Sequence, residues 1–324
     1  MGMKVVIVGA GAMGGLFAAR LARGDGEVDV AVLDAAPEVV AAINAQGLTL
    51  QDKDGTETAR VPATTGPADL GPADLAIFFV KAQHTAAAAQ LARPLVTPAT
   101  TVVSLQNGWG NSDTLAATFP PEQLVMGVTY HSATVLGPGR VAHTGQGATV
   151  IGPYLDDAPL DRAEGVRDVL ARGGLEATVT PRVKTEIWKK LILNAATLPT
   201  AALTRLCAGD LGQPGPMLDL VDALAAEAVA VARAQGYAID RDERIARIHA
   251  VLAGAGRGKA SMLQDVEARR KTEIEVINGA VVRAAERSSL DAPLNRAMVA
   301  LIGGLERGWR QEHEGAGAGG ARSR

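Results

Sequence analysis

The sequence predicts an α/β protein in which a parallel sheet covered by helices is followed by an all-helical C-terminal domain. Three observations predict this fold class. In the first half, short β-branched apolar runs alternate with Ala-rich helical stretches, which is the pattern of a parallel sheet flanked by helices. A Gly-rich turn follows the first of these runs. From residue 183 onward, apolar residues recur three and four positions apart, as they do in amphipathic helices.

The elements of the first domain follow from these runs in order. Its candidate strands are 4–8, 28–33, 75–80 and 101–105. Three further strand-like pieces are separated by Gly and Pro, and we expect them to extend the sheet through hairpins. They cover residues 123–130, 139–144 and 148–151. A helix at 160–171 and a strand at 177–180 would complete this domain.

The second half is predicted to be helical at 187–206, 217–234, 243–252 and 274–285. A chain of 324 residues exceeds the size at which a single core usually stops growing. We therefore expect one domain at 1–182 and a second at 183–313. Residues 314–324 are mostly Gly, Ala, Arg and Ser, with little to bury, so a disordered tail is expected there.

Composition excludes several classes of protein. The formal net charge is −3 and basic residues are interspersed with acids, so no basic face is expected to bind nucleic acid. The single cysteine, Cys207, cannot form an intramolecular disulfide and is interpreted as a small buried apolar residue. The sequence contains no run of 18 apolar residues, so we expect no membrane span and a cytoplasmic protein. The sequence does not determine the oligomeric state, and a homodimer is one of the states it allows.

The Gly-rich turn indicates a dinucleotide-binding site of the Rossmann type. Gly9, Gly11 and Gly14 have the GxGxxG spacing between an apolar run and an amphipathic stretch. In such a turn the first glycine permits the tight bend and the second lets the backbone approach a pyrophosphate. The third allows the helix to pack closely on the strand. This context also argues against reading the apolar N-terminus as a signal peptide.

An acid at the end of the second predicted strand bears on the choice of cofactor. Asp34 lies 20 residues after Gly14, where a carboxylate accepts hydrogen bonds from the adenosine ribose and repels the 2′-phosphate of NADP. This favours NADH over NADPH. The alternative is that Asp34 caps the next helix, although Pro37 suits the first helical position and would make Ala36 the cap.

Four more segments carry a family resemblance. They are Val80-Lys-Ala, Gln106-Asn-Gly, 188–194 (WKKLILN), and the run from Ser261-Met-Leu-Gln-Asp to 271–279 (KTEIEVING). Together with the Gly-rich turn they resemble the ketopantoate reductase (2-dehydropantoate 2-reductase) family over about residues 3–310. The resemblance implies a Rossmann domain joined to a helical domain, and an NAD(P)H-dependent reduction of a 2-keto acid in the cleft.

The resemblance also implies roles for two residues of one helix. Lys190 matches the family's catalytic lysine, and Asn194 matches the asparagine that orients the substrate. Residues four apart share a helix face, so the ammonium and the amide would project together. Lys190 would protonate the alkoxide as a general acid, helped if burial lowers its pKa. Without the resemblance, Lys190 would be an ordinary solvated lysine.

Other residues of the first domain match the family at predicted strand ends. Asn107 matches an asparagine that contacts cofactor and substrate, and its alternative is a simple Asn-Gly turn. Lys81 resembles the family's cofactor-side lysine, and its alternative is a solvated lysine at the end of a strand.

Two residues of the second domain match the family's substrate ligands. Ser261 resembles the ligand of the substrate carboxylate, and Glu273 the acid that binds substrate or cofactor hydroxyls. On one straight helix they would stand about 18 Å apart, so we expect a break, with Thr272 and Glu275 as the capping box of a fresh helix. The alternatives are a helix cap for Ser261 and an acid favoured by the helix dipole for Glu273.

Metal dependence is not indicated, because the five histidines and the single cysteine have no metal-ligand spacing. His131 follows a predicted strand close to the expected cleft. It is interpreted either as a structural histidine or as a residue that touches substrate.

The leading functional hypothesis is NAD(P)H-dependent reduction of ketopantoate to D-pantoate, a step of pantothenate and coenzyme A biosynthesis. Two departures from the family pattern bear on it: Leu198 replaces an asparagine found in several members, and Asp34 replaces the basic residue usual in NADPH-using members. The alternative is an NAD-dependent D-2-hydroxyacid dehydrogenase of the mandelate type. A third hypothesis is a non-catalytic protein that senses nicotinamide dinucleotides.

Overall fold

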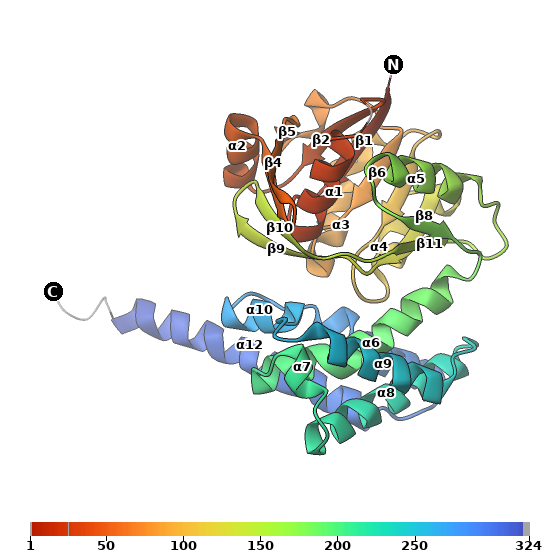
Figure 1. Cartoon of the computed structure of the whole chain (residues 1–324), viewed down its shortest axis with the longest axis vertical. Coiled ribbons are helices and arrows are strands. Elements are labelled where there is room, and N and C mark those ends of the chain that lie inside the picture. Colours follow the sequence, from red (N-terminus) through yellow and green to blue (C-terminus); the bar gives the residue numbers. More distant parts are fainter. Residues whose placement is uncertain (1, 25, 320–324) are drawn as a thin grey trace. The chain divides into compact units, whose positions relative to one another are not determined.

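The computed structural model describes the backbone of residues 2–24 and 26–319 and divides into two compact units (Figure 1). The sheet unit comprises Met1–Gln106 and Gly110–Glu186, and the helical unit comprises Asn107–Trp109 and Ile187–Arg324. The sheet unit extends to Glu186, four residues beyond the predicted boundary after residue 182. Helix α6 does begin at Val183, but a Cβ built on Gly152 would lie 2.9 Å from the Val183 Cβ, so the first turn of α6 packs on the sheet unit.

The main sheet has eight strands in the order β5-β2-β1-β6-β7-β8-β11-β12. The first six in this order are mutually parallel, β11 is antiparallel to β8, and β12 is parallel to β11. The predicted strands of this sheet begin and end within two residues of the observed ones. These are β1 (Met3–Val8), β2 (Val28–Leu33), β6 (Leu75–Phe78), β7 (Thr101–Ser104), β8 (Leu124–Thr129), β11 (Thr149–Pro153) and β12 (Ala177–Val179); the short β5 (Ala63–Thr64) was not predicted.

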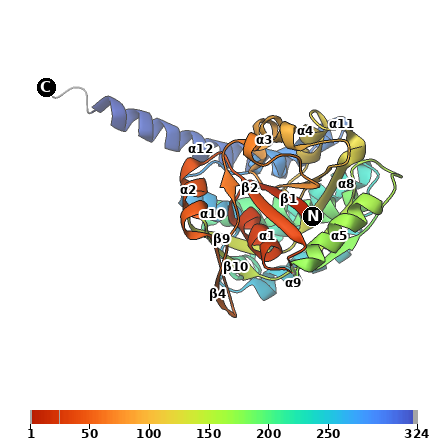
Figure 2. The same ribbon diagram turned by 90° about the horizontal axis from the view of Figure 1, so that it is seen from above.

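Helices cover both faces of the main sheet because its strands are apolar on both sides. In β1, Val5 and Ile7 belong to the core beneath one pair of helices, while Val6 and Val8 belong to the core beneath another pair. This alternation is the two-residue repeat of a strand. The first pair is α1 (Ala12–Ala22) and α5 (Asp161–Arg172), and the second is α3 (Thr85–Ala92) and α4 (Asn111–Ala116), as Figure 2 shows. The fold class predicted for the first domain is confirmed.

A second, four-stranded sheet packs on α1 and was not predicted. Its order is β4-β3-β10-β9, with β3 at Leu48–Asp52, β4 at Gly55–Ala59, β9 at Ser132–Gly137 and β10 at Arg140–Gly145. The piece predicted at 139–144 is therefore a strand, but it does not extend the main sheet. It pairs in parallel with β3, about 90 residues earlier in the chain, and such long-range pairing leaves no local signal in the sequence.

The remaining helices of the sheet unit are short. They are α2 (Pro37–Gln46) and the 3₁₀ turns η1 (Pro67–Asp69), η2 (Ala82–His84), η3 (Arg93–Leu95) and η4 (Pro121–Gln123). Pro37 stands at the start of α2 with Ala36 as its N-cap, as predicted.

The helical unit is built around its own apolar core, which α6, α8, α11 and α12 supply in large part. The predicted helix 274–285 is interrupted: a 3₁₀ turn, η5, precedes α11. The helices from residue 183 onward are α6 (Val183–Thr204), α7 (Ala208–Leu211), α8 (Pro216–Ala234), α9 (Arg241–Ala255), α10 (Ser261–Glu267), η5 (Ile274–Val276), α11 (Asn278–Arg287) and α12 (Pro293–Gly319).

The predicted tail overlaps the last helix. Helix α12 continues to Gly319, whereas disorder was predicted from residue 314. Adding residues to an existing helix is far easier than starting one, so a few Gly and Ala residues do not end it at once. Residues 320–324 lie outside the described residues.

Candidate active site

The Gly-rich turn of the sheet unit has the geometry that its spacing predicts. Gly9 has a φ of +95°, which is left-handed backbone that favours glycine. A Cβ on Gly14 would lie 1.8 Å from the Gly9 carbonyl oxygen, so only glycine lets α1 pack this closely on the end of β1. A Cβ on Gly11 would meet no atom within 4 Å. The backbone is therefore accessible at the position where a pyrophosphate would approach the start of α1.

Asp34 follows β2 and is held by two backbone N–H groups. Its Oδ2 accepts from the Ala10 N–H at 2.6 Å, and its Oδ1 accepts from the Ala36 N–H at 2.9 Å. Asp34 is not the N-cap of α2, because that residue is Ala36, and the bond that Asp34 accepts comes from the Ala36 N–H itself. Instead it ties the Gly-rich turn to the end of the second strand, a position suited to the adenosine ribose.

Several candidate residues follow strands at the carboxyl edge of the main sheet. Gly9 follows β1 and Asp34 follows β2, while Lys81 follows β6 as the N-cap of η2. In open α/β sheets ligands bind outside this edge. The sheet unit therefore has the residues to hold a dinucleotide along the ends of β2, β1 and β6.

In the helical unit, the structure brings Lys190 and Asn107 together. The Lys190 ammonium donates a hydrogen bond to the Asn107 Oδ1 at 2.8 Å, although 83 residues separate them. Burial lowers the pKa of Lys190 to about 8, and the charge of Glu273 partly opposes this shift. An amine with such a pKa is still mostly protonated at pH 7 but gives up its proton far more readily than a solvated lysine.

The Asn107–Trp109 segment is anchored by contacts that sequence reasoning missed. The backbone N–H of Trp109 donates to the Val276 carbonyl at 2.8 Å. The Trp109 ring packs on those of Trp188 and Tyr237, whose centroids lie 5.5 and 5.8 Å away. Gly108, between Asn107 and Trp109, has a φ of +87°, and a Cβ added to it would lie 2.5 Å from the Val276 carbonyl oxygen. The Asn-Gly-Trp sequence was the available signal, but Asn-Gly is also a common turn.

Asn194 and Glu273 are both buried in the same unit as Lys190. Asn194 lies one turn further along α6 and is 7% exposed; within the described part of the chain no hydrogen bond of its amide is found. Glu273 is 9% exposed and precedes η5. Its carboxylate is near enough to Lys190 to raise that residue's pKa. Lys190, Asn107 and Glu273 therefore interact, with Asn194 on the same helix as Lys190.

Ser261 is exposed and is the first residue of α10, after the N-cap Ala260. The predicted break before Glu273 is present, because α10 ends at Glu267. The predicted capping box is wrong: the Thr272 hydroxyl donates to Glu306 at 2.7 Å, and the chain continues as a 3₁₀ turn. Glu306 is only 7% exposed. A buried carboxylate needs hydrogen-bond donors, and the Thr272 hydroxyl is one of them.

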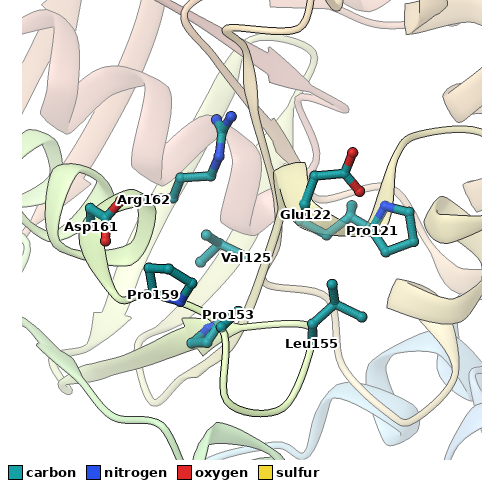
Figure 3. A pocket seen from close by; sticks show the side chains of 10 residues that line it. Pro121, Glu122, Val125, Pro153, Leu155, Pro159, Asp161 and Arg162 are labelled. Carbon is teal, nitrogen blue, oxygen red and sulfur yellow. The ribbon is translucent and has the colours of Figure 1, made fainter.

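A surface pocket lies in the sheet unit (Figure 3). It is lined by Glu122, Leu124, Arg162 and neighbours that include Pro153, and by none of the predicted site residues. Leu124 begins β8 and Pro153 ends the antiparallel β11, so the pocket opens at the amino edge of the parallel strands. Ligands of such sheets bind at the opposite edge, and we do not assign the pocket a role in the reaction.

In the part of the chain that the structure describes, no three or more His, Cys, Asp or Glu side chains are placed to hold a metal ion. No helix within it is both long and apolar enough to cross a membrane.

Comparisons with known proteins place the chain among reductases. A sequence profile described as ketopantoate reductase PanE/ApbA matches residues 5–156, and one described as the C terminal of the same enzyme matches residues 182–306. The 2-dehydropantoate 2-reductase of Halobacterium salinarum is 32% identical over 93% of this chain and 98% of its own length. That of Archaeoglobus fulgidus is 31% identical over 94% and 98%.

Solved structures are similar over nearly the whole chain. D-mandelate dehydrogenase, in a ternary structure with NADH and anilino(oxo)acetate, has a TM-score of 0.90 at 27% identity and covers 94% of this chain and 99% of its own. The PanE/ApbA family ketopantoate reductase of Ralstonia eutropha JMP134 has a TM-score of 0.86 at 31% identity, covering 95% and 100%. Profiles that match both units, and relatives above 30% identity along nearly the full chain, show that this chain belongs to the ketopantoate reductase family.

Proposed function

We propose that this protein reduces ketopantoate to D-pantoate with a nicotinamide cofactor and that Lys190 is the general acid. The observation that carries the proposal is the Lys190 amine, which donates to Asn107 and has a pKa of about 8. The family to which the chain belongs and the names of its relatives support the same reaction class.

The residues of the sheet unit fit a dinucleotide. Gly11 leaves the backbone open to a pyrophosphate, and Asp34 is oriented by two N–H groups at the ribose end. Bound there, the reduced cofactor supplies the hydride for the ketone carbon. No residue of the chain has to carry electrons, so the side chains need only orient the keto acid and supply one proton.

The proton step falls to Lys190. As the ketone carbon accepts hydride, negative charge develops on its oxygen, and the Lys190 ammonium transfers a proton to that oxygen. Asn107 accepts a hydrogen bond from the same ammonium and so restricts where its other protons point. Asn194, one turn away on the same helix, has an amide suited to orienting a hydroxyl or carboxylate of the substrate. Ser261 is proposed to bind the substrate carboxylate, and Glu273 to bind hydroxyl groups.

Asp34 supports NADH as the preferred cofactor. A carboxylate held at the end of β2 would lie close to the 2′-phosphate of NADPH and repel it. Lys81 is proposed to contact the cofactor from the end of β6. Replacing Asp34 with Asn removes the charge but keeps the shape, so the ratio of NADPH to NADH turnover should rise.

One observation favours a second function. Leu198 stands one turn beyond Asn194, where several family members have an asparagine that contacts the substrate hydroxyl. An apolar side chain there suits a larger or more apolar substrate side chain, as in a D-2-hydroxyacid dehydrogenase of the mandelate type. The structure of D-mandelate dehydrogenase is among the similar ones.

A matrix of substrates and cofactors tests both functions. The purified protein is assayed with ketopantoate, phenylglyoxylate and branched 2-keto acids, each with NADH and NADPH. We expect the highest kcat/KM with ketopantoate and NADH. If ketopantoate is reduced no faster than the other acids, the proposed substrate is wrong; a clear NADPH preference would refute the role given to Asp34.

A further inference from the structure

A chain of polar side chains joins the second sheet to the end of β8 within the sheet unit. Arg20 on α1 donates to the Asp52 carboxylate at 2.7 Å and its Nη2 lies 3.5 Å from the His143 Nδ1. The His143 Nε2 lies 3.0 Å from the Nδ1 of His131, the second residue after β8. These four side chains come from α1, β3, β10 and the carboxyl edge of the main sheet.

The donors at both ends of this chain determine the protonation of the two rings. A guanidinium has no acceptor, so the His143 Nδ1 that faces Arg20 must carry a lone pair. The His143 Nε2 is then the N–H that donates to the His131 Nδ1. The Gly147 N–H also points at the His131 Nδ1, at 3.4 Å, which requires the same lone pair there. The proton of neutral His131 is therefore on Nε2.

That Nε2 is buried and has no hydrogen-bond partner among the described residues. His131 is only 8% exposed, and leaving a buried donor unsatisfied is costly. The ring is also held in place from the side, because the Phe17 ring meets it edge-on at 6.0 Å. A fixed and unpaired donor of this kind is suited to an acceptor that arrives with a ligand.

The position of His131 along the sheet edge indicates which ligand. The strand order runs β2-β1-β6-β7-β8, with Asp34 after β2 and the Gly-rich turn after β1. A dinucleotide with its ribose at Asp34 and its pyrophosphate at α1 extends past β6 toward β8. Strands are about 4.8 Å apart, so the end of β8 lies about 14 Å from that of β1, which is the reach of the nicotinamide half.

We propose that His131 donates its Nε2 hydrogen to an oxygen on the nicotinamide half of the bound cofactor, either the carboxamide oxygen or a ribose hydroxyl. This assignment rests on the proposed function for the cofactor, but not for the keto acid. His131 is then a cofactor ligand, while His143 positions it by fixing which nitrogen carries the proton.

The electrostatics of the cluster suit an uncharged acceptor. Burial, His143 and Arg20 lower the pKa of His131 to about 4. Burial and Arg20 likewise lower the pKa of His143, against smaller opposing effects of Gly145 and Asp52. At neutral pH the His131 ring is thus a donor without a charge.

Direct binding measurements on the full chain test the assignment. His131→Phe keeps a ring of similar size that still packs on Phe17 but has no donor. We expect it to weaken NADH binding about 3- to 10-fold. ADP lacks the nicotinamide half, so its Kd should not change. Thionicotinamide adenine dinucleotide, with sulfur in place of the carboxamide oxygen, separates the two acceptors: the penalty shrinks for this analogue only if the carboxamide is the partner.

Two further variants control the measurement. His143→Phe leaves His131 in place but removes the donor to its Nδ1, and we expect a weaker loss of NADH affinity with ADP binding unchanged. His249→Phe removes a half-exposed histidine of the helical unit and should change the Kd of neither NADH nor ADP. If the protein binds NADPH instead, the same comparison is made with NADPH and 2′,5′-ADP, which lacks the nicotinamide half.

Unchanged NADH affinity in a folded His131→Phe protein would overturn the proposal, because the Nε2 partner would then be water alone. An equal loss for ADP would also overturn it, by showing a general distortion of the unit. Normal cofactor binding without turnover of any keto acid would instead refute the proposed reaction while leaving the role of His131 intact.

Discussion

Two short segments that depend on glycine differ in how they are held. The Gly-rich turn after β1 is closed by local contacts: Gly14 fits against the Gly9 carbonyl oxygen, five residues away. The Asn107–Trp109 segment is closed by distant ones, because Gly108 fits against Val276 and Trp109 packs on Trp188 and Tyr237.

The difference explains why only one of them is visible as a pattern. Local closure places its glycines at a constant spacing, so that the spacing itself predicts the structure. Closure by a distant residue leaves a single glycine whose neighbours in space are unknown from the chain. In both cases the missing Cβ makes room for a backbone carbonyl, and in both the result is to position groups that a ligand would meet.

The largest expected effect tests the chemistry that the second segment supports. Lys190→Ala should lower kcat about 10² to 10⁴-fold, because alanine has no proton to give to the developing alkoxide. NADH affinity, measured by fluorescence titration, should stay close to the wild-type value. Lys189→Ala is the matched control on the same helix and should keep most of the activity. A Lys190→Ala enzyme with unchanged kcat would remove this residue from the mechanism.

The first segment is tested by comparing two of its glycines. Gly14→Ala places a Cβ 1.8 Å from a backbone oxygen, and we expect the free energy of unfolding to fall by about 3 kcal/mol. Gly11→Ala meets no atom within 4 Å, so stability should change by less than about 0.5 kcal/mol. Its methyl group would nevertheless lower NADH affinity by about tenfold or more. Chemical denaturation and titration separate the two effects; equal stability of the two variants would contradict this account.

The second segment is tested in the same way at Gly108. A side chain there has to displace the Val276 carbonyl or move Asn107 away from Lys190, so Gly108→Ala should lower kcat about 10²-fold. Gly110→Ala is the control: its φ is +102°, but no atom lies within 4 Å of the added Cβ. It should cost about 1 to 2 kcal/mol of stability and leave kcat nearly unchanged. Similar kcat values in both variants would show that Asn107 does not need this anchor.

The smallest effect concerns pH. With a pKa of about 8, Lys190 is protonated below that pH, so kcat for reduction should be flat near pH 6 to 7 and fall above about 8. The charge of Glu273 raises this pKa, and Glu273→Gln should therefore move the decline to lower pH, whatever it does to the maximal rate. A decline that stays in place or moves to higher pH would exclude the interaction of the two groups.

Much of the fold was predictable because its signals are local. Apart from β5, the strands of the main sheet are short and mostly apolar runs, and their predicted ends are correct to within two residues. The second sheet was missed because β3 and β10, which pair within it, lie about 90 residues apart in the chain. The 3₁₀ turn at Ile274–Val276 was missed because the Thr272 hydroxyl donates to Glu306, 34 residues later in the chain, a contact that the local sequence does not indicate.

The sequence by itself determined the parallel sheet, the glycine turn, the acid at Asp34 and the helix that carries Lys190 and Asn194, since each depends on residues close together in the chain. Only the tertiary structure decided that Lys190 meets Asn107, that burial lowers the pKa of Lys190 and that His143 of β10 lies against His131, in the loop after β8. Hydrogen bonding and desolvation depend on distance in space, and chain separations of 83 and 12 residues do not specify that distance.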